Sequence, residues 1–123
     1  MKNNTLIVIL HSNEKERINY ALSIIASGAA IGRNTELFFT GKSVTNLLTS
    51  DLLKKKKINS QFNFSNTNEL LLASIELKTK FHACSGALTD NKINKNDIRK
   101  DLKINLTGLP EIISNKNCQL LFI

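Results

Sequence analysis

The residue of this chain best suited to chemistry is Cys84. It follows the short stretch Lys80–Ala83, which is typical of a buried strand, and it precedes Ser85 and Gly86, where the next segment turns out over the sheet edge. In an alternating α/β chain, ligands and reactive groups gather at the carboxyl ends of strands. A thiol at such a point can be both exposed and activated. The position of Cys84 therefore indicates thiol chemistry, without naming a substrate.

The two residues after Cys84 could activate its thiol. The thiolate is the nucleophilic form of cysteine, and a cysteine pKa falls from about 8.5 when helix N-terminal amides or cations lie nearby. If a helix or tight turn begins at Ser85 and Gly86, their free N–H groups would point at the sulfur. Gly86 would let the backbone approach closely, because it has no Cβ. The alternative is a buried, inert cysteine, which is a common fate for this residue type.

Three further residues bear on this site, and a chemical role is considered only for His11. His11 closes the first apolar run and could face the same sheet edge as Cys84, as a general base or an anion contact, or be merely partly exposed. His82 lies two residues before Cys84, so strand alternation places it on the same sheet face, where we predict a packing residue. Cys118 opens the last strand, and we predict that it fills space in the core or at an edge.

The number and spacing of the cysteines argue against structural cross-links. Cys84 and Cys118 are the only cysteines, and no CxxC pair is present. In a cytoplasmic protein both should be reduced, so we expect no disulfide. Two histidines and two cysteines at unrelated spacings do not form a zinc signature.

Length and composition predict one globular domain. The 123 residues, of which 41% are hydrophobic, suit a single domain spanning 1–123 with one core. The apolar run Leu6–Leu10 near the start is far too short for the hydrophobic region of an export signal. No stretch approaches the roughly 20 apolar residues of a membrane helix. We therefore expect a cytoplasmic protein that does not enter the membrane.

The net charge of +7 does not predict a nucleic-acid partner. It comes from 14 Lys and only three Arg, in a chain that also holds 16 Asn and 14 Ile, so it indicates compositional drift. Arginine is the residue favoured for bidentate contacts to phosphate and bases. The one dense cluster, Lys54–Lys57, is predicted to be a solvated loop.

Hydrophobic patterns predict alternating strands and helices. We expect five strands, at Leu6–Leu10, Glu36–Thr40, a short segment ending at Cys84, Ile104–Leu106 and Cys118–Ile123. We expect a first helix at Glu14–Ile31, capped by Asn13 and ended by Gly32. Further helices are expected at Ser43–Leu53, Asn66–Lys78, Asn94–Leu102 and Pro110–Asn115. A polar connector is expected over 54–65. Such alternation predicts a mostly parallel sheet with helices on both faces.

Nothing in the chain predicts a bound nucleotide or flavin. No GxxxxGK[ST] motif is present, and the first strand leads into His11–Glu14, which lacks the glycines that wrap a pyrophosphate. Gly28 and Gly32 lie at a helix end and not after a strand. We therefore expect no cofactor.

The order of these segments resembles the DsrE/DsrF/DsrH-like family over nearly the whole length. No single segment is specific, and the resemblance rests on their order and spacing. The segments are the N-terminal apolar strand, the alanine-rich helix Ala21–Gly32, the Glu-Leu-Phe-Phe strand ending at Thr40-Gly41, the strand ending in Ala83-Cys84-Ser85, a short acid-containing helix near Asp97-Ile98, Ile104–Leu109 and the final Gln119–Phe122.

This resemblance implies a three-layer α/β/α sandwich with a five-stranded parallel sheet, assembled as homo-trimers or hexamers. It also implies that Cys84 stands where sulfur-relay members carry a persulfide between a donor and an acceptor protein. One segment departs from the family pattern: residues 91–96 are rich in Asn and Lys, where relatives tend to be more apolar and to contain glycine.

Two functions from different classes follow. In the first, the Cys84 thiolate takes the outer sulfur of a donor persulfide and passes it to an acceptor thiol, with Ser85 and Gly86 amides stabilising the thiolate and His11 assisting. This exchange needs no metal or cofactor. In the second, the protein is a non-catalytic oligomeric module whose sheet-edge pocket binds a small anion or a partner peptide, and Cys84 is incidental.

Overall fold

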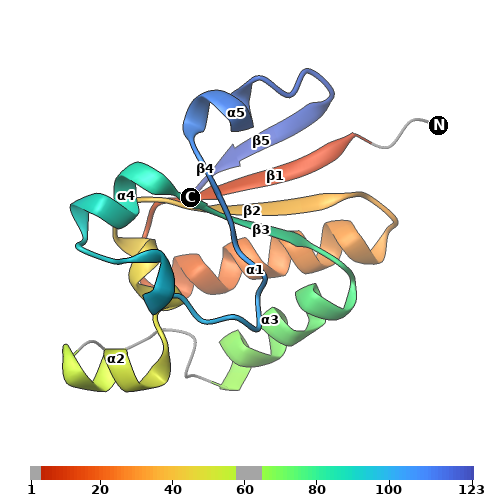
Figure 1. The fold of residues 1–123 in the computed structure, drawn as a ribbon. Coiled ribbons are helices and arrows are strands. Elements are labelled where there is room, and N and C mark those ends of the chain that lie inside the picture. The colour runs from red at the N-terminus through yellow and green to blue at the C-terminus, as the bar shows by residue number, and fades with distance from the viewer. Residues whose placement is uncertain (1–3, 58–64) are drawn as a thin grey trace.

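The computed structural model describes residues 4–57 and 65–123, which form one five-stranded sheet (Figure 1). All neighbouring strands run parallel, in the spatial order β4-β3-β2-β1-β5. This confirms the predicted α/β class. The strands are β1 (Thr5–Leu10), β2 (Thr35–Phe39), β3 (Lys80–Cys84), β4 (Asn105–Thr107) and β5 (Cys118–Phe122), each within one residue of its prediction at either end.

Helices cover the two faces of the sheet unequally. In Figure 1, α1, α2 and α3 lie on one side of the sheet, which we call the first face, and α5 lies on the other, the second face. None of the described helices is long and apolar enough to cross a membrane. The helical segments are α1 (Lys15–Ala30), the 3₁₀ turn η1 (Gly41–Leu47), α2 (Ser50–Lys55), α3 (Ser65–Glu76), α4 (Ser85–Asp90), the 3₁₀ turn η3 (Lys95–Asp97) and α5 (Leu109–Ile113).

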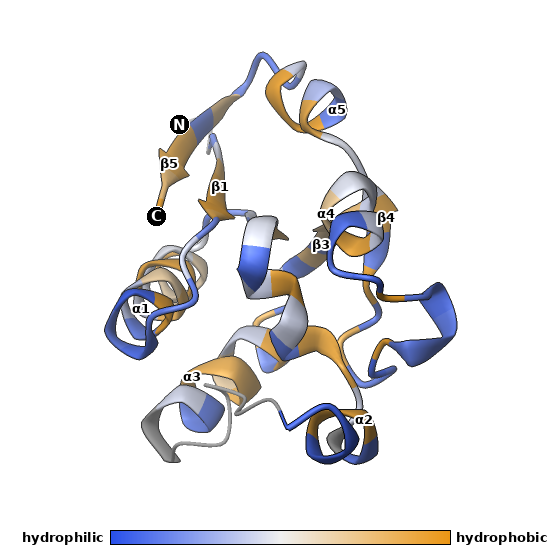
Figure 2. Cartoon of the chain, turned by 90° about the vertical axis from the view of Figure 1, so that its left-hand side faces the viewer, coloured by the Kyte–Doolittle hydropathy of each residue, from blue (hydrophilic) through white to orange (hydrophobic). Residues whose placement is uncertain are grey.

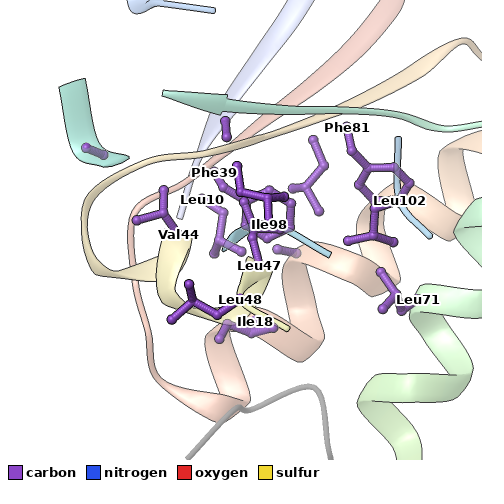
Figure 3. Packing of buried hydrophobic residues seen from close by; sticks show 14 of the residues in the cluster. Leu10, Ile18, Phe39, Val44, Leu47, Leu48, Leu71, Phe81, Ile98 and Leu102 are labelled. Carbon is purple, nitrogen blue, oxygen red and sulfur yellow. The ribbon is translucent and has the colours of Figure 1, made fainter. Parts of the chain in front are cut away.

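The main hydrophobic core lies between the first face and its helices (Figure 3). Alternate residues of the three central strands point into it, because successive strand side chains face opposite sides. Helix α1 adds one apolar stripe and α3 packs against that helix. The buried residues labelled in Figure 3 are Leu10, Ile18, Phe39, Val44, Leu47, Leu48, Leu71, Phe81, Ile98 and Leu102.

A smaller core lies on the second face. Ile7 and Ile9 of β1, Phe38 of β2 and Ile112 of α5 form this cluster, which we call the second-face cluster. Strand β1 is buried on both faces, so its sequence is continuously apolar and does not alternate with polar residues. Such sequences are common in the strands of parallel sheets. The five-residue α5 contributes one buried side chain, so this layer is thin.

The helix predicted at Ser43–Leu53 is wrong, because the chain forms η1, breaks at Leu48 and then forms α2. The buried Ser43 hydroxyl donates to the carbonyl oxygens of Leu10 and Thr40, both at 2.7 Å. Leu48 then makes an antiparallel bridge with Ile98. The bond to Leu10 and the bridge to Ile98 join segments far apart in the sequence, so the local hydrophobic pattern does not predict this break.

The same bridge shortens the helix predicted at Asn94–Leu102. The expected cap is present, since Asn94 and Asp97 form a capping box at the start of η3. The turn ends at Asp97, because Ile98 bridges Leu48 and the Arg99 amide donates to the Leu47 carbonyl at 2.7 Å.

The ends of α1 were predicted with one error. Gly32 ends the helix with φ of +91°, as its position predicts. Glu14, and not Asn13, occupies the N-cap, and the Asn13 side-chain oxygen instead accepts a hydrogen bond of 2.7 Å from Asn46. The Asn13 side chain therefore bonds a distant residue, Asn46, and does not cap the helix.

The lysine run Lys54–Lys57 is exposed at the end of α2. Cations at a helix C-terminus interact favourably with the helix dipole, which gives this run a structural role. Residues 58–64 of the predicted connector lie outside the described residues.

Candidate functional site

Cys84 lies where β3 passes directly into α4. It is the last residue of β3 and the N-cap of α4, which begins at Ser85. The thiol is free and partly buried, and its backbone pairs with Thr107 of β4. The structure therefore places the cysteine at the carboxyl edge of the sheet, with a helix starting immediately after it.

The N–H groups at the start of α4, which were expected to point at the sulfur, make no capping hydrogen bond with the Cys84 side chain. Gly86 lies beside the sulfur, since a Cβ added at Gly86 would be 3.8 Å from Cys84 Sγ. The Cys84 side chain packs against both the main core and the second-face cluster.

Hydrogen bonds tie α4, β4 and α5 together around Cys84. The Ser85 hydroxyl donates to the Thr107 carbonyl at 3.4 Å, and the Thr107 hydroxyl donates to the Glu111 carboxylate of α5. Ser85 thus contacts the strand beside Cys84 rather than the sulfur. These contacts hold the start of α4 against the edge of the sheet.

His82 and Glu36 form a hydrogen-bonded pair on the same face as Cys84. His82 Nε2 is 2.7 Å from Glu36 Oε1, and the two side chains are only 13% and 18% exposed. His82 Nδ1 is buried and has no hydrogen-bond partner among the described residues. The alternation of strand residues predicted that His82 lies on this face. Its partner Glu36 could be identified only from the structure, because the pairing depends on the register of β2 against β3.

His11 lies at the same edge of the sheet but apart from Cys84. It follows β1, and β2 separates β1 from β3. Its ring stacks on Phe122 of β5 with centroids 5.8 Å apart and lies close to Gly41. No described contact joins His11 to Cys84, so His11 belongs to the β1–β5 side of this edge.

Cys118 stands at the opposite end of the sheet. It begins β5, and its Sγ donates a hydrogen bond of 3.1 Å to the Asn115 carbonyl. The thiol is free, like that of Cys84. Within residues 4–57 and 65–123, no three His, Cys, Asp or Glu side chains gather closely enough to hold a metal ion.

Taken together, this part of the sheet has a partly accessible thiol and, on the same face, a mostly buried imidazole paired with a carboxylate. A free thiol that is partly accessible can attack an electrophilic sulfur. The arrangement is therefore suited to thiol exchange.

Comparisons with known proteins agree with this fold. The sequence pattern of the DsrE/DsrF-like family matches residues 3–115. No curated protein sequence matches significantly.

Solved structures of the same fold come from an archaeon and from bacteria. The protein of unknown function MTH1491 from Methanobacterium thermoautotrophicum has a TM-score of 0.72 at 13% identity, with 98% of this chain and 100% of that chain covered. The ychN protein of E. coli also has a TM-score of 0.72, at 12% identity, with 99% and 100% covered. The protein of unknown function BT1422 from Bacteroides thetaiotaomicron has a TM-score of 0.66 at 16% identity, with 98% and 95% covered.

Proposed function

Because the chain belongs to the DsrE/DsrF-like family, we propose that it is a sulfur carrier that holds a persulfide on Cys84. The observation that carries this proposal is the placement of Cys84. Its free, partly accessible thiol ends β3 and begins α4 at the carboxyl edge of a parallel sheet. This edge is where α/β sheets bind and transform ligands.

The exchange is balanced without an oxidant or a cofactor. The Cys84 thiolate attacks the outer sulfur of a donor persulfide, a new S–S bond forms, and the donor leaves as a thiol. An acceptor thiolate then attacks the sulfur on Cys84 and regenerates the free cysteine. The partners are therefore a persulfide donor and a thiol acceptor. Both steps require reduced thiols, which the cytoplasm maintains, so we place the carrier there.

The residues around Cys84 take different parts in this proposal. Ser85 and Gly86 form the backbone beside the sulfur, and a Cβ added at Gly86 would lie 3.8 Å from Sγ, in ordinary contact. His11 contributes to the more distant part of the edge, where a partner's surface would rest against its stacked pair with Phe122.

The test is persulfide loading of the intact protein. Incubation with a low-molecular-weight persulfide should add about 32 Da, one sulfur atom, to the wild type and to Cys118→Ser. Cys84→Ser should gain nothing. Cys118→Ser is the matched control, because both cysteines are free and partly buried. A wild type that gains no sulfur under conditions that load another persulfide carrier would refute the proposal.

A second candidate function is supported by exposed apolar side chains on β5 and α5. Phe122 is 70% exposed and Ile113 59% exposed, and Leu109 and Leu120 are also exposed. Phe122 pairs with Ile9 and Leu120 with Ile7, so both lie on the thinly covered second face. Figure 2 shows hydrophobic colour along much of β5. The non-catalytic alternative is a homo-oligomeric module, a trimer or hexamer, that buries this surface and binds a small anion or a peptide.

Two measurements distinguish the two functions: the mass of the assembly by light scattering, and the uptake of sulfur by Cys84. Phe122→Glu should lower the mass of any assembly that uses this surface, whereas Tyr20→Glu, at an exposed site of α1, should not. Assembly together with a Cys84 that never takes up sulfur would favour the module. Assembly with loading is compatible with an oligomeric carrier.

A further inference from the structure

We propose that a hollow beside β4 is the docking site for an acidic segment of the protein that exchanges sulfur with Cys84. This inference rests on the proposed sulfur-carrier function and adds to it the chemistry of the partner. The hollow, which we call the β4 hollow, is formed by β4 and by residues 95–104, which precede it. These preceding residues take no part in the carrier chemistry proposed above.

The first support is the composition of the lining. The β4 hollow has a volume of about 210 Å³. Among the described residues, those that line it are four basic and three apolar ones, without an acidic one: Lys95, Ile98, Arg99, Lys100, Lys103, Ile104 and Leu106. Basic groups beside apolar ones complement a segment in which carboxylates alternate with apolar side chains.

The second support is that the lysines of the β4 hollow have no carboxylate partner within the chain. Lys95, Lys100 and Lys103 are exposed. Within residues 4–57 and 65–123, none of these three side chains takes part in an ion pair. Three positive charges around one hollow create a local field that attracts an anionic partner. An acidic segment would therefore supply the missing carboxylates.

The acidic residues of the same segment are bonded to other groups. Asp97 Oδ2 accepts a hydrogen bond of 3.0 Å from the Asn94 backbone amide, as part of the capping box of η3. Asp101 Oδ1 accepts a hydrogen bond of 2.7 Å from Arg99 Nε. In the part of the chain that the structure describes, Arg99 is therefore the one cation of the lining with a carboxylate partner.

The third support is the place of β4 in the sheet. Among the described strands β4 pairs with β3 alone, so its outer edge has no strand partner. Such an edge can pair with an extended segment of another chain. The lysines beside this edge favour an acidic segment over a second copy of this chain, because two copies with a net charge of +7 repel each other.

The fourth support is the short distance to Cys84. Leu106 lines the β4 hollow and is 40% exposed, and the next residue, Thr107, pairs with Cys84. Neighbouring strands lie about 4.8 Å apart and rise about 3.3 Å per residue, so the Cα atoms of Leu106 and Cys84 are roughly 6 Å apart. A segment bound along β4 would therefore bring its protein to the sheet edge where the thiol lies.

The test measures the binding of short fluorescent peptides by anisotropy. In the acidic peptide Glu alternates with Leu, and in the control peptide Gln replaces each Glu. We expect the wild type to bind the acidic peptide about 10-fold more tightly at low salt, and this difference should shrink as salt screens the charges. Equal affinity for the two peptides at low salt would overturn the proposal.

Charge reversal locates the binding. The triple variant Lys95→Glu, Lys100→Glu and Lys103→Glu should weaken binding of the acidic peptide by about 10-fold. The matched control reverses Lys54–Lys56 at the end of α2, which are also exposed, and so changes the net charge by the same amount. At about 0.15 M salt the Debye length is about 8 Å, so the control should stay within about threefold of the wild type.

Equal weakening by the two triple variants would overturn the proposal, because binding would then follow the net charge and not the β4 hollow. If the glutamate variant does not fold, glutamine at the same two sets of lysines makes the same comparison. The glutamine set at the β4 hollow should still weaken binding, by a smaller factor than the glutamate set, and the set on α2 should not.

A reactive form of the peptides tests the placement beside Cys84. Each peptide ends in a cysteine held as a pyridyl disulfide. The cysteine thiolate of the protein attacks the peptide sulfur, a mixed disulfide forms, and pyridinethione leaves, so one disulfide replaces another without net oxidation. In Cys118→Ser, the acidic peptide should label Cys84 about 10-fold faster than the control peptide.

In Cys84→Ser, the two peptides should label Cys118 at similar rates, because Cys118 begins β5 at the opposite end of the sheet. A Cys84 that reacts equally fast with both peptides, although the acidic one binds more tightly, would overturn the placement.

Neither assay contains a persulfide, so docking and sulfur carriage can fail separately. A wild type that takes up no sulfur, but binds the acidic peptide at the β4 hollow, retains the docking surface and refutes the carrier. A wild type that loads sulfur on Cys84 but binds both peptides equally retains the carrier and refutes the docking surface.

Discussion

Replacing Gly41 by alanine should show how tightly the edge of the sheet holds His11. Gly41 has φ of +56°, in the left-handed region. A Cβ built there would lie 2.6 Å from His11 Cδ2 and 2.9 Å from Nε2, too close for any real contact. The ring would have to move, and it is stacked on Phe122 with centroids 5.8 Å apart.

The expected cost has two parts. Placing a residue with a Cβ in the left-handed region costs roughly 1–2 kcal/mol. Displacing His11 from Phe122 forfeits an aromatic contact of about 0.5–1.5 kcal/mol. Gly41→Ala should therefore lower the free energy of unfolding by about 2–3 kcal/mol. Gly32→Ala is the control, because Gly32 also has positive φ, at +91°, but a Cβ there meets nothing within 4 Å.

The assay is denaturant unfolding of a double-mutant cycle between Gly41→Ala and His11→Ala. With the ring removed, the cost of Gly41→Ala should fall to the backbone part alone. This gives a coupling of about 1 kcal/mol between the two positions, well above the error of such cycles. Equal costs of Gly41→Ala with and without the His11 ring would refute the reasoning.

Three other changes test separate parts of the structure. Gly86→Ala should remain folded and still load sulfur, because its Cβ would lie in ordinary contact with Cys84 Sγ at 3.8 Å; loss of loading by mass spectrometry would contradict this. Phe38→Ala should lower the free energy of unfolding by about 3–5 kcal/mol in a denaturant titration, because it empties a fully buried site; a cost below about 1 kcal/mol would contradict the packing. Arg99→Gln should raise the pKa of Asp101, which the hydrogen-bonded Arg99 guanidinium holds below its usual range, and carboxyl NMR titration checks this. A carboxyl whose pKa is lower in the folded protein adds stability above its unfolded pKa of 3.8, and this stability is lost as the pH falls through the folded pKa. The pair is about half exposed, so the wild type should be more stable than Arg99→Gln by less than about 1 kcal/mol at neutral pH. This difference should vanish in acid.

The strands could be predicted because their signals are local. Leu6–Leu10 is a continuous apolar run bounded by polar residues, and the structure extends it only to Thr5. The end of β3 at Cys84 was also predicted, because Ser85 and Gly86 mark a change of direction there. A strand buried on both faces leaves this pattern whatever its partners are.

The remaining differences depend on contacts between distant segments. The bridge of Leu48 with Ile98 interrupts two predicted helices, and neither segment carries a local sign of it. The bond of His82 to Glu36 is of the same kind, because it depends on how β3 aligns with β2. Sequence periodicity places a residue on a face, but it does not supply the register between strands.

The place of β5 in the sheet has a consequence for folding kinetics. Among residues 4–57 and 65–123, β5 pairs with β1 alone, so Thr5 pairs with Cys118 across almost the whole of that length. During folding, one edge of β1 therefore stays unpaired until β5, the strand furthest from it in the sequence, joins the sheet. Pairings of such long sequence separation slow folding, because the loop must close before the contacts stabilise it. The last cooperative step of folding should be the docking of β5, which completes the hydrogen bonding of β1.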